Sequence, residues 1–143
     1  MCTVTSPYKE SKTFTGYKCV IKRNEKIYSP VTGLEYKVGP VPKIKKKGRY
    51  ANRCYGHVMN PSSPAYDPNM VGKTGLFDSA NIAILRYGLT STAVVKMTIS
   101  GDLHNGVLNG TPGCPPEEHV IVGNHIDKIK IPKELYIITK KEL

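Results

Sequence analysis

The fold is decided by residues 92–100, which read Thr92-Ala93-Val94-Val95-Lys96-Met97-Thr98-Ile99-Ser100. Apolar and β-branched residues dominate this run and the turn signal Gly101-Asp102 ends it, so it is the strongest strand pattern in the chain. A short apolar segment, residues 80–87, lies just before it. That segment predicts one buried helix, with Asp78 as its N-cap and Gly88 as its stop.

Weaker strand patterns flank this helix and strand on both sides. They occur at residues 17–23, 26–28, 34–38, 54–59, 119–122, 127–131 and 135–139. Loops rich in turn residues are predicted at 60–69 and 105–116. Because only one helix is predicted, the βαβ alternation of a parallel sheet is missing. The sequence therefore predicts an α+β domain, with a mostly antiparallel, twisted sheet and one principal helix packed on one face.

The polar composition of the first residues predicts an arm followed by one domain. Residues 1–15 are rich in Ser, Thr and Lys, which is typical of a flexible N-terminal arm. Residues 16–143 then form a single α+β domain. No apolar run reaches the ~18–20 residues that cross a bilayer, and the start lacks the pattern of a secretory signal. We expect a cytoplasmic protein, in the producing or infected cell, that does not bind membranes.

The cysteines and histidines give no pattern of metal ligands. The four cysteines are far apart with no C-x-x-C pair, and no two of the four histidines have the i, i+4 spacing of a helical site. We therefore expect reduced thiols, with a disulfide pair as the alternative. We predict no metal and no cofactor, although a metal site assembled from distant residues stays open.

Positive charge is concentrated in the N-terminal part of the chain, whose overall net charge is +10. Residues 1–39 hold seven basic and three acidic side chains, whereas residues 40–53 hold six basic and no acidic ones. Residues 54–143 hold eight of each. A focused basic surface attracts nucleic acids or phosphorylated small molecules. The alternative is a solvated, lysine-rich loop that only aids solubility.

A second indication of anion binding is Gly72-Lys73-Thr74, which is similar to the end of a phosphate-binding loop. The full pattern requires a glycine where this chain has Asp67, which argues against an ATPase. Backbone N–H groups of such a loop can still bind an anion with help from Lys73. The chain also lacks a G-x-S-x-G nucleophile motif. We therefore predict no catalytic residues, and a binding protein more than an enzyme.

Several short motifs resemble small uncharacterised proteins of phages and prophages. They are Tyr28-Ser29-Pro30-x-Thr32-Gly33, the pair Gly56-His57, and Ile99-Ser100-Gly101-Asp102-Leu103 before the closing strands. The pair departs from the family, whose members commonly place an aromatic residue between the glycine and the histidine. The resemblance implies no established activity and no catalytic residues. It does favour a phage accessory or counter-defence role.

Together these features predict a non-enzymatic binding protein for a phosphorylated, nucleotide-derived ligand, which as a phage counter-defence factor would sequester a host immune signal. The expected ligand contacts are basic residues and the tyrosines between them. They are Lys45, Lys47, Arg49, Tyr50, Arg53, Tyr55, Lys73 and Arg86.

Three other functions stay open. The same basic segment suits a nucleic-acid-binding or nuclease-inhibiting protein, with tyrosines as stacking platforms. A small enzyme acting on a nucleotide, of the ADP-ribosyl transfer type, is a second alternative. The third is docking on a host protein alone, through a strand edge or the 105–116 loop. The sequence also leaves a homo-oligomer open.

Overall fold

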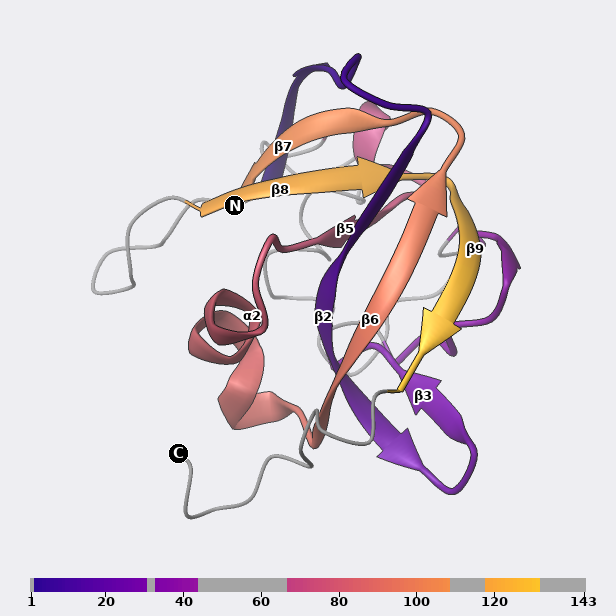
Figure 1. Ribbon diagram of the computed structural model, residues 1–143, viewed down its shortest axis with the longest axis vertical. Helices are drawn as coiled ribbons and strands as arrows, with labels where there is room; N and C mark the ends of the chain where they lie inside the picture. Colours follow the sequence, from indigo (N-terminus) through magenta and orange to yellow (C-terminus); the bar gives the residue numbers. More distant parts are fainter. Residues whose placement is uncertain (1, 31–32, 44–66, 109–117, 132–143) are drawn as a thin grey trace.

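The computed structural model describes residues 2–30, 33–43, 67–108 and 118–131 (Figure 1). The strands are β1 (Cys2–Pro7), β2 (Thr13–Arg23), β3 (Lys26–Tyr28), β4 (Gly39–Pro40), β5 (Thr74–Leu76), β6 (Ala93–Ser100), β7 (His104–Leu108), β8 (Glu118–Gly123) and β9 (His125–Lys130). The helical segments are the 3-10 turns η1 (Pro68–Met70) and η2 (Gly88–Thr90) and the α-helix α2 (Ala80–Tyr87). This confirms the predicted class of a mostly antiparallel sheet protein with one helix.

The described strands form two connected sheets. Their strand orders are β1-β7-β8-β5 and β3-β2-β6-β9-β4, and every pairing between these described strands is antiparallel. Tyr17 of β2 and Phe77 after β5 exchange both backbone hydrogen bonds, of 2.8 and 2.9 Å, which joins the sheets on one side. On the other side only Asn124 separates β8 from β9. The predicted twisted sheet is therefore two sheets that curl into a half-barrel.

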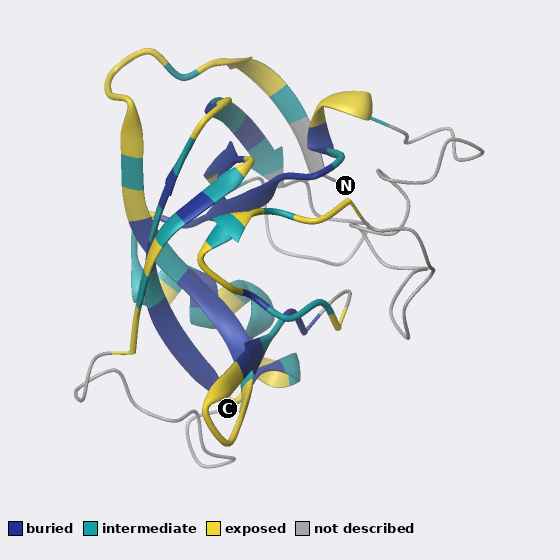
Figure 2. Ribbon diagram, turned by 90° about the vertical axis from the view of Figure 1, so that its right-hand side faces the viewer, coloured by how far each residue is buried: buried dark blue, intermediate teal, exposed yellow. Residues whose placement is uncertain are grey.

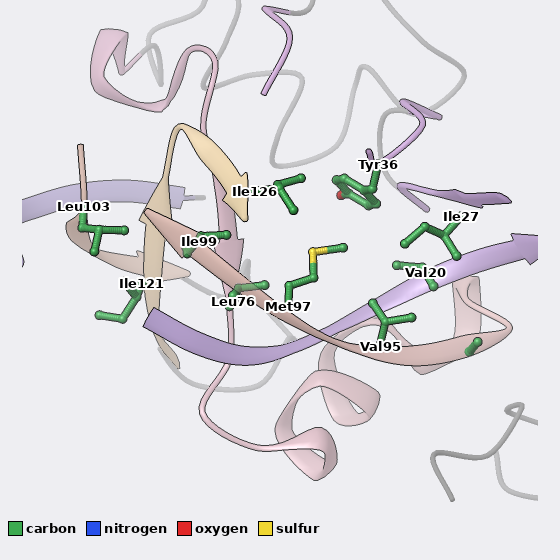
Figure 3. Packing of buried hydrophobic residues seen from close by; sticks show 11 residues of the cluster. Val20, Ile27, Tyr36, Leu76, Val95, Met97, Ile99, Leu103, Ile121 and Ile126 are labelled. Carbon is green, nitrogen blue, oxygen red and sulfur yellow. The ribbon is translucent and has the colours of Figure 1, made fainter. Parts of the chain in front are cut away.

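The interior of the half-barrel is filled by alternate residues of its strands. On β6, Val95, Met97 and Ile99 are fully buried in the interior. Figure 3 shows them packed with aliphatic side chains of β2, β5, β8 and β9 and with Tyr36. Figure 2 shows the same pattern at larger scale, with buried residues along the strands and exposed ones at the turns. The period of two that predicted strand 92–100 thus also fixes which side chains enter the core.

A second apolar layer lies between the five-stranded sheet and α2. Cys19 of β2, Val94 of β6 and Ala83 of α2 are buried in this layer. In Figure 3, α2 lies on the opposite side of β2 and β6 from the labelled interior residues. The outer faces of β2 and β6 are therefore partly covered by the helix, as expected for a helix packed on one face.

The ends of α2 differ from the sequence prediction. The N-cap is Ser79, whose hydroxyl accepts a hydrogen bond of 3.2 Å from the amide of Ile82. Asp78 is exposed and precedes the cap. Gly88 has a right-handed φ of −58°, so it does not stop the chain as a left-handed cap, and the chain continues into η2. The N-terminal difference arises because Ser79, one residue nearer the helix than Asp78, is an equally favoured cap.

The N-terminal residues belong to a sheet, although their composition predicted a flexible arm over residues 1–15. Residues 2–7 form β1, which pairs with β7, and β2 already begins at Thr13. The amide of Val4 also donates to the carboxylate of Asp67, at 2.8 Å. An edge strand with one neighbour keeps much of its surface in water, so polar residues are compatible with it.

Two other expectations need correction. The predicted loop 105–116 begins as a strand, because β7 runs from His104 to Leu108 between β1 and β8. Residues 34–38 form no strand and make one isolated bridge, between Tyr28 and Glu35. Gly33 and Gly39 on either side have φ of 76° and 129°, which turns the chain out of the sheet. The strand patterns at 54–59 and 135–139 lie outside the described residues.

Candidate functional site

Most of the predicted ligand contacts lie outside the described residues. These are Lys45, Lys47, Arg49, Tyr50, Arg53 and Tyr55. Of the other two, Lys73 lies in the turn before β5, and Arg86 lies in the last turn of α2, where its charge complements the helix dipole. Lys73 contacts the β6–β7 turn, whereas α2 packs on β2 and β6. The structure therefore places these two cations in separate surroundings.

The turn that carries Lys73 is anchored in the core. Met70, at the end of η1, is 1% exposed, and its carbonyl accepts a hydrogen bond of 3.2 Å from the amide of Lys73. Gly72 between them has a φ of 71°, in the left-handed region that favours glycine. Asp67 caps η1, because its carboxylate accepts from the amide of Asn69 at 3.0 Å. The cap at Asp67 and the burial of Met70 therefore fix this turn. A phosphate-binding loop would have a glycine at position 67 instead.

Lys73 is a buried cation that forms an ion pair with Asp102. Its side chain is 6% exposed, and its ammonium lies 3.0 Å from the carboxylate of Asp102. The Nδ1 atom of His104 lies 3.3 Å from the same ammonium and 3.3 Å from the other carboxylate oxygen of Asp102. Asp102 is 60% exposed. A ligand anion would therefore reach Lys73 in competition with Asp102.

A second histidine–aspartate pair lies where β6 meets β9. The Nδ1 atom of His125 and the hydroxyl of Ser100 each lie 2.7 Å from the same oxygen of Asp127. The hydrogen bond from Ser100 lowers the pKa of Asp127 most, the bond from His125 lowers it further, and partial burial opposes both. Ser100 and His125 thus both bind the carboxylate. A nucleophile activated by a base would instead require the serine to bind the histidine.

Segment 39–43 places Lys43, at the start of the basic segment, beside the turn that contains Lys73. The amide of Val41 donates a hydrogen bond of 2.9 Å to the carbonyl of Asn124, at the β8–β9 corner. Two residues later, the side-chain stem of Lys43 lies 3.3 Å from the position that a Cβ on Gly72 would take. Lys43 is the first lysine of the basic segment 40–53. The start of that segment and the Lys73 turn, about thirty residues apart in sequence, therefore lie side by side.

Residues 34–42, which come just before Lys43 in the chain, line a cleft of about 350 Å³. Its lining is mostly apolar, with Glu35 and Lys37 as the charged residues. The lining residues are Leu34, Glu35, Tyr36, Lys37, Val38, Gly39, Pro40, Val41, Pro42 and Ile126. This volume is at the lower end of small-molecule sites in proteins.

A buried lysine, Lys18, lies next to Tyr36 of the cleft lining, and the sequence analysis did not nominate it. Lys18 of β2 is 9% exposed, and its ammonium donates a hydrogen bond of 2.8 Å to the carbonyl of Gly75. The same ammonium lies 5.2 Å from the ring centroid of Tyr36, within reach of a cation–π interaction. Its place in β2, two residues before the buried Val20, is the signal that could have found it.

The sequence also did not nominate Asp102, His104 and Lys43 as site residues. Asp102 was used only as a turn signal, and Lys43 only as one charge of the basic run. Their proximity to Lys73 depends on the pairing of β7 with β8 and on the path of segment 39–43. Neither feature can be predicted from the local sequence, because both depend on contacts between distant segments.

The described ranges hold neither a cluster of metal ligands nor a helix suited to crossing a membrane. Among those residues no three or more His, Cys, Asp or Glu side chains lie close enough together to hold a metal ion. Over the same ranges, α2 and the other helical segments fall short of the length and apolarity that crossing a membrane requires. Comparisons with protein-family models, with curated proteins and with solved structures each found no match to this chain.

Proposed function

We propose that this is a non-enzymatic binding protein for a phosphorylated, nucleotide-derived small molecule. The apolar part of the ligand occupies the cleft formed by residues 34–42. Its phosphates are bound by Lys43, by the Gly72–Lys73 turn and by the basic segment that Lys43 begins. The observation that carries this proposal is the contact between Lys43 and Gly72, which joins the two segments that suggest anion binding.

The geometry around the cleft favours such a ligand. Val41 and Pro42 line the cleft, and Lys43 follows directly, so a ligand in the cleft lies next to the basic segment. Tyr36 contributes an aromatic ring to the lining. Cations beside a partly apolar cleft are suited to a molecule that has a flat apolar part and a charged tail.

The arrangement of the polar side chains favours binding over turnover. Ser100 and His125 both bind Asp127, so the hydroxyl is not activated by the imidazole. Lys73 is ion-paired with Asp102 at 3.0 Å, so in this proposal a ligand phosphate takes the place of that carboxylate at the ammonium. In this proposal the protein sequesters its ligand, and the phage-like motifs suggest a host immune signal as that ligand.

The direct test is titration calorimetry against cyclic and ADP-ribose-type nucleotides, with the matching unphosphorylated nucleosides as controls. We expect one or more phosphorylated compounds to bind and their nucleosides to bind at least tenfold more weakly. The chain has no Trp, so a co-purified nucleotide would also raise the 260 to 280 nm absorbance ratio clearly. Absence of binding across the whole panel would contradict the proposal.

Two matched variants separate a local contact from overall charge. Lys43→Gln removes the exposed lysine at the Gly72 turn, and Lys12→Gln removes an equally exposed lysine from the β1–β2 connection. We expect only Lys43→Gln to weaken nucleotide binding, by about tenfold for one charged contact. Equal effects of the two variants would place the ligand elsewhere.

A further inference from the structure

Three lysines lie on the outer face of the five-stranded sheet. Lys96 of β6 pairs directly with Lys130 of β9, and Thr98 pairs with Lys128. The residues between them, Met97 and Ile129, pack in the interior cluster. Because side chains alternate between the faces of a strand, the three lysines project outward together. Figure 1 shows β2, β6 and β9 side by side, and we call this surface the lysine face.

The lysine face is unfavourable for folding. Like charges directly opposite each other in an antiparallel pair destabilise the sheet, and Lys96 and Lys130 occupy such a position. None of the three lysines has an ion-pair partner within 4.0 Å among the described carboxylates. Asp127, on the same strand, is bound by Ser100 and His125. The repulsion between Lys96 and Lys130 is a local conflict in the sheet, and such conflicts are expected at functional surfaces.

The neighbours of these lysines are an aromatic ring and two hydroxyls. Tyr17 of β2 pairs with Lys96, whose ammonium lies 5.8 Å from the ring centroid. Thr15 of β2 pairs with Thr98, and their hydroxyls are 2.9 Å apart. Lys128 and Lys130 are exposed, whereas Tyr17 and Lys96 are half-buried. The face thus combines cations, hydrogen-bonding hydroxyls and one stacking surface across three adjacent strands.

We infer that the lysine face binds single-stranded nucleic acid, as a site separate from the cleft of the proposed function. Lysines and hydroxyls are the side chains that contact phosphates. An aromatic ring next to them offers a stacking platform that accepts any base. An acidic protein would satisfy the charges without using the ring, so the combination favours nucleic acid.

The shape of the face favours a single strand over a duplex. Lys128 and Lys130 are two residues apart on one strand, or about 6.7 Å, and Lys96 lies on the adjacent strand. The cations therefore spread over a sheet surface that an extended strand can follow. The major groove of a duplex admits a helix or a two-stranded ribbon, and the lysine face is a broader surface of three strands.

Fluorescence anisotropy with a labelled oligothymidylate of about 20 nucleotides tests the inference. We expect binding that weakens with salt, with log K falling by about 0.7 per log unit of salt for each phosphate contacted by a lysine. For three contacts this is a loss of about 20-fold between about 50 and 200 mM salt. An equivalent duplex and polyglutamate serve as competitors, and we expect both to compete more weakly than unlabelled oligothymidylate.

The variant Lys96→Gln/Lys128→Gln/Lys130→Gln should lose most of this affinity and its salt dependence. The matched control is Lys9→Gln/Lys12→Gln/Lys22→Gln, which changes the net charge equally through exposed lysines away from the lysine face. We expect the control to retain affinity within about threefold, because only local contacts release counterions. Equal losses in both variants, no binding by the wild type, or stronger competition by polyglutamate would overturn the inference.

Unfolding in urea distinguishes loss of binding from loss of folding. Because Lys96 and Lys130 repel each other, the face variant should unfold at a urea midpoint equal to or above that of the wild type. A lower midpoint would contradict the repulsion on which the inference rests. Calorimetry with the nucleotide panel should be unchanged by the face variant, so failure of this inference and of the proposed function are distinguishable.

Discussion

Gly16 lies where the two sheets approach each other closely. A Cβ placed on it would lie 2.6 Å from the carbonyl oxygen of Phe77 and 2.8 Å from the ring of Phe14. That carbonyl accepts the hydrogen bond from Tyr17 that joins the sheets, so it is not free to move away. Glycine at position 16 is therefore required by the close approach of β2 and β5.

We predict that Gly16→Ala lowers the free energy of unfolding by about 1–3 kcal/mol, the usual range for overpacking. Urea denaturation measures this as a lower midpoint with an unchanged m-value. Thr13→Ala, at the exposed start of the same strand, is the control and should cost less than about 1 kcal/mol. A Gly16→Ala protein as stable as the wild type would mean that the sheets are farther apart than described.

The thiol of Cys19 predicts a dependence of stability on alkaline pH. Burial raises its pKa from 9.0 to about 12, and nearby Lys18 and Ser91 reduce the rise only in part. Above pH 9 the unfolded chain loses a proton that the folded chain keeps. The free energy of unfolding should therefore fall by about 1.4 kcal/mol per pH unit between the two pKa values.

The measurement compares wild type with Cys19→Ala, because other groups also titrate in this range. The wild-type curve of unfolding free energy against pH should be flat relative to the variant below pH 8 and decline beyond it. The same burial predicts that native Cys19 reacts slowly with a thiol reagent and that the unfolded chain reacts fast. Parallel curves for the two proteins would show that the folded thiol ionises as easily as a free one.

At the scale of the element, two residues are candidates for the N-cap of α2, Ser79 in the structure and Asp78 in the sequence prediction. Ser79→Ala should cost about 1 kcal/mol, because it removes the acceptor of the Ile82 amide. Asp78→Ala leaves that hydrogen bond intact and should cost only a few tenths of a kcal/mol. Ser79→Asp should retain most of the stability, since Asp is an equally good cap. Urea midpoints of the three variants give the comparison, and the reverse ranking of Ser79 and Asp78 would assign the cap to Asp78.

Elements with strong local patterns were predictable from the sequence. β6, β8 and β9 agree with the predicted strands within about two residues. α2 has the predicted bounds but is not the buried helix expected, because Leu85 is 66% exposed. β1 and β7 were not predicted, because a polar edge strand and a glycine-containing strand acquire their structure by pairing with each other and with β8. The alternation at 34–38 was mistaken for a strand, since it places only Tyr36 in the core while Val38 is 63% exposed.

At the scale of the whole molecule, charge counted along the chain did not locate the charged surfaces. The part after residue 53 balances to zero, yet it contains all three cations of the lysine face. Strand alternation and register sort these lysines onto one side, and register depends on pairing between distant segments. The contact of Lys43 with Gly72 is equally non-local. The sequence could therefore nominate Lys73 but not its partners Asp102 and His104.

If the half-barrel is one cooperative unit, the amides that join its sheets should be among its most protected. We predict that the amides of Tyr17 and Phe77 exchange with deuterium as slowly as those of β6, which bonds to neighbours on both sides. Amides of the edge strands β1 and β3 should exchange first. Nuclear magnetic resonance at neutral pH measures this order. Rapid exchange at Tyr17 and Phe77 would show that the two sheets open independently.

Only Asn124 separates β8 from β9, so whether an odd or an even number of residues is inserted at this corner should affect which way Ile126 points. Ile126 points inward and Lys128 and Lys130 outward, because an irregularity in the β6–β9 pairing at Asp127 interrupts the alternation between Ile126 and Lys128. One residue added or removed at Asn124 would shift Ile126 away from its partner Ile99 and turn its side chain out of the interior. A library of insertions here should therefore show survivors mainly with even numbers of added residues.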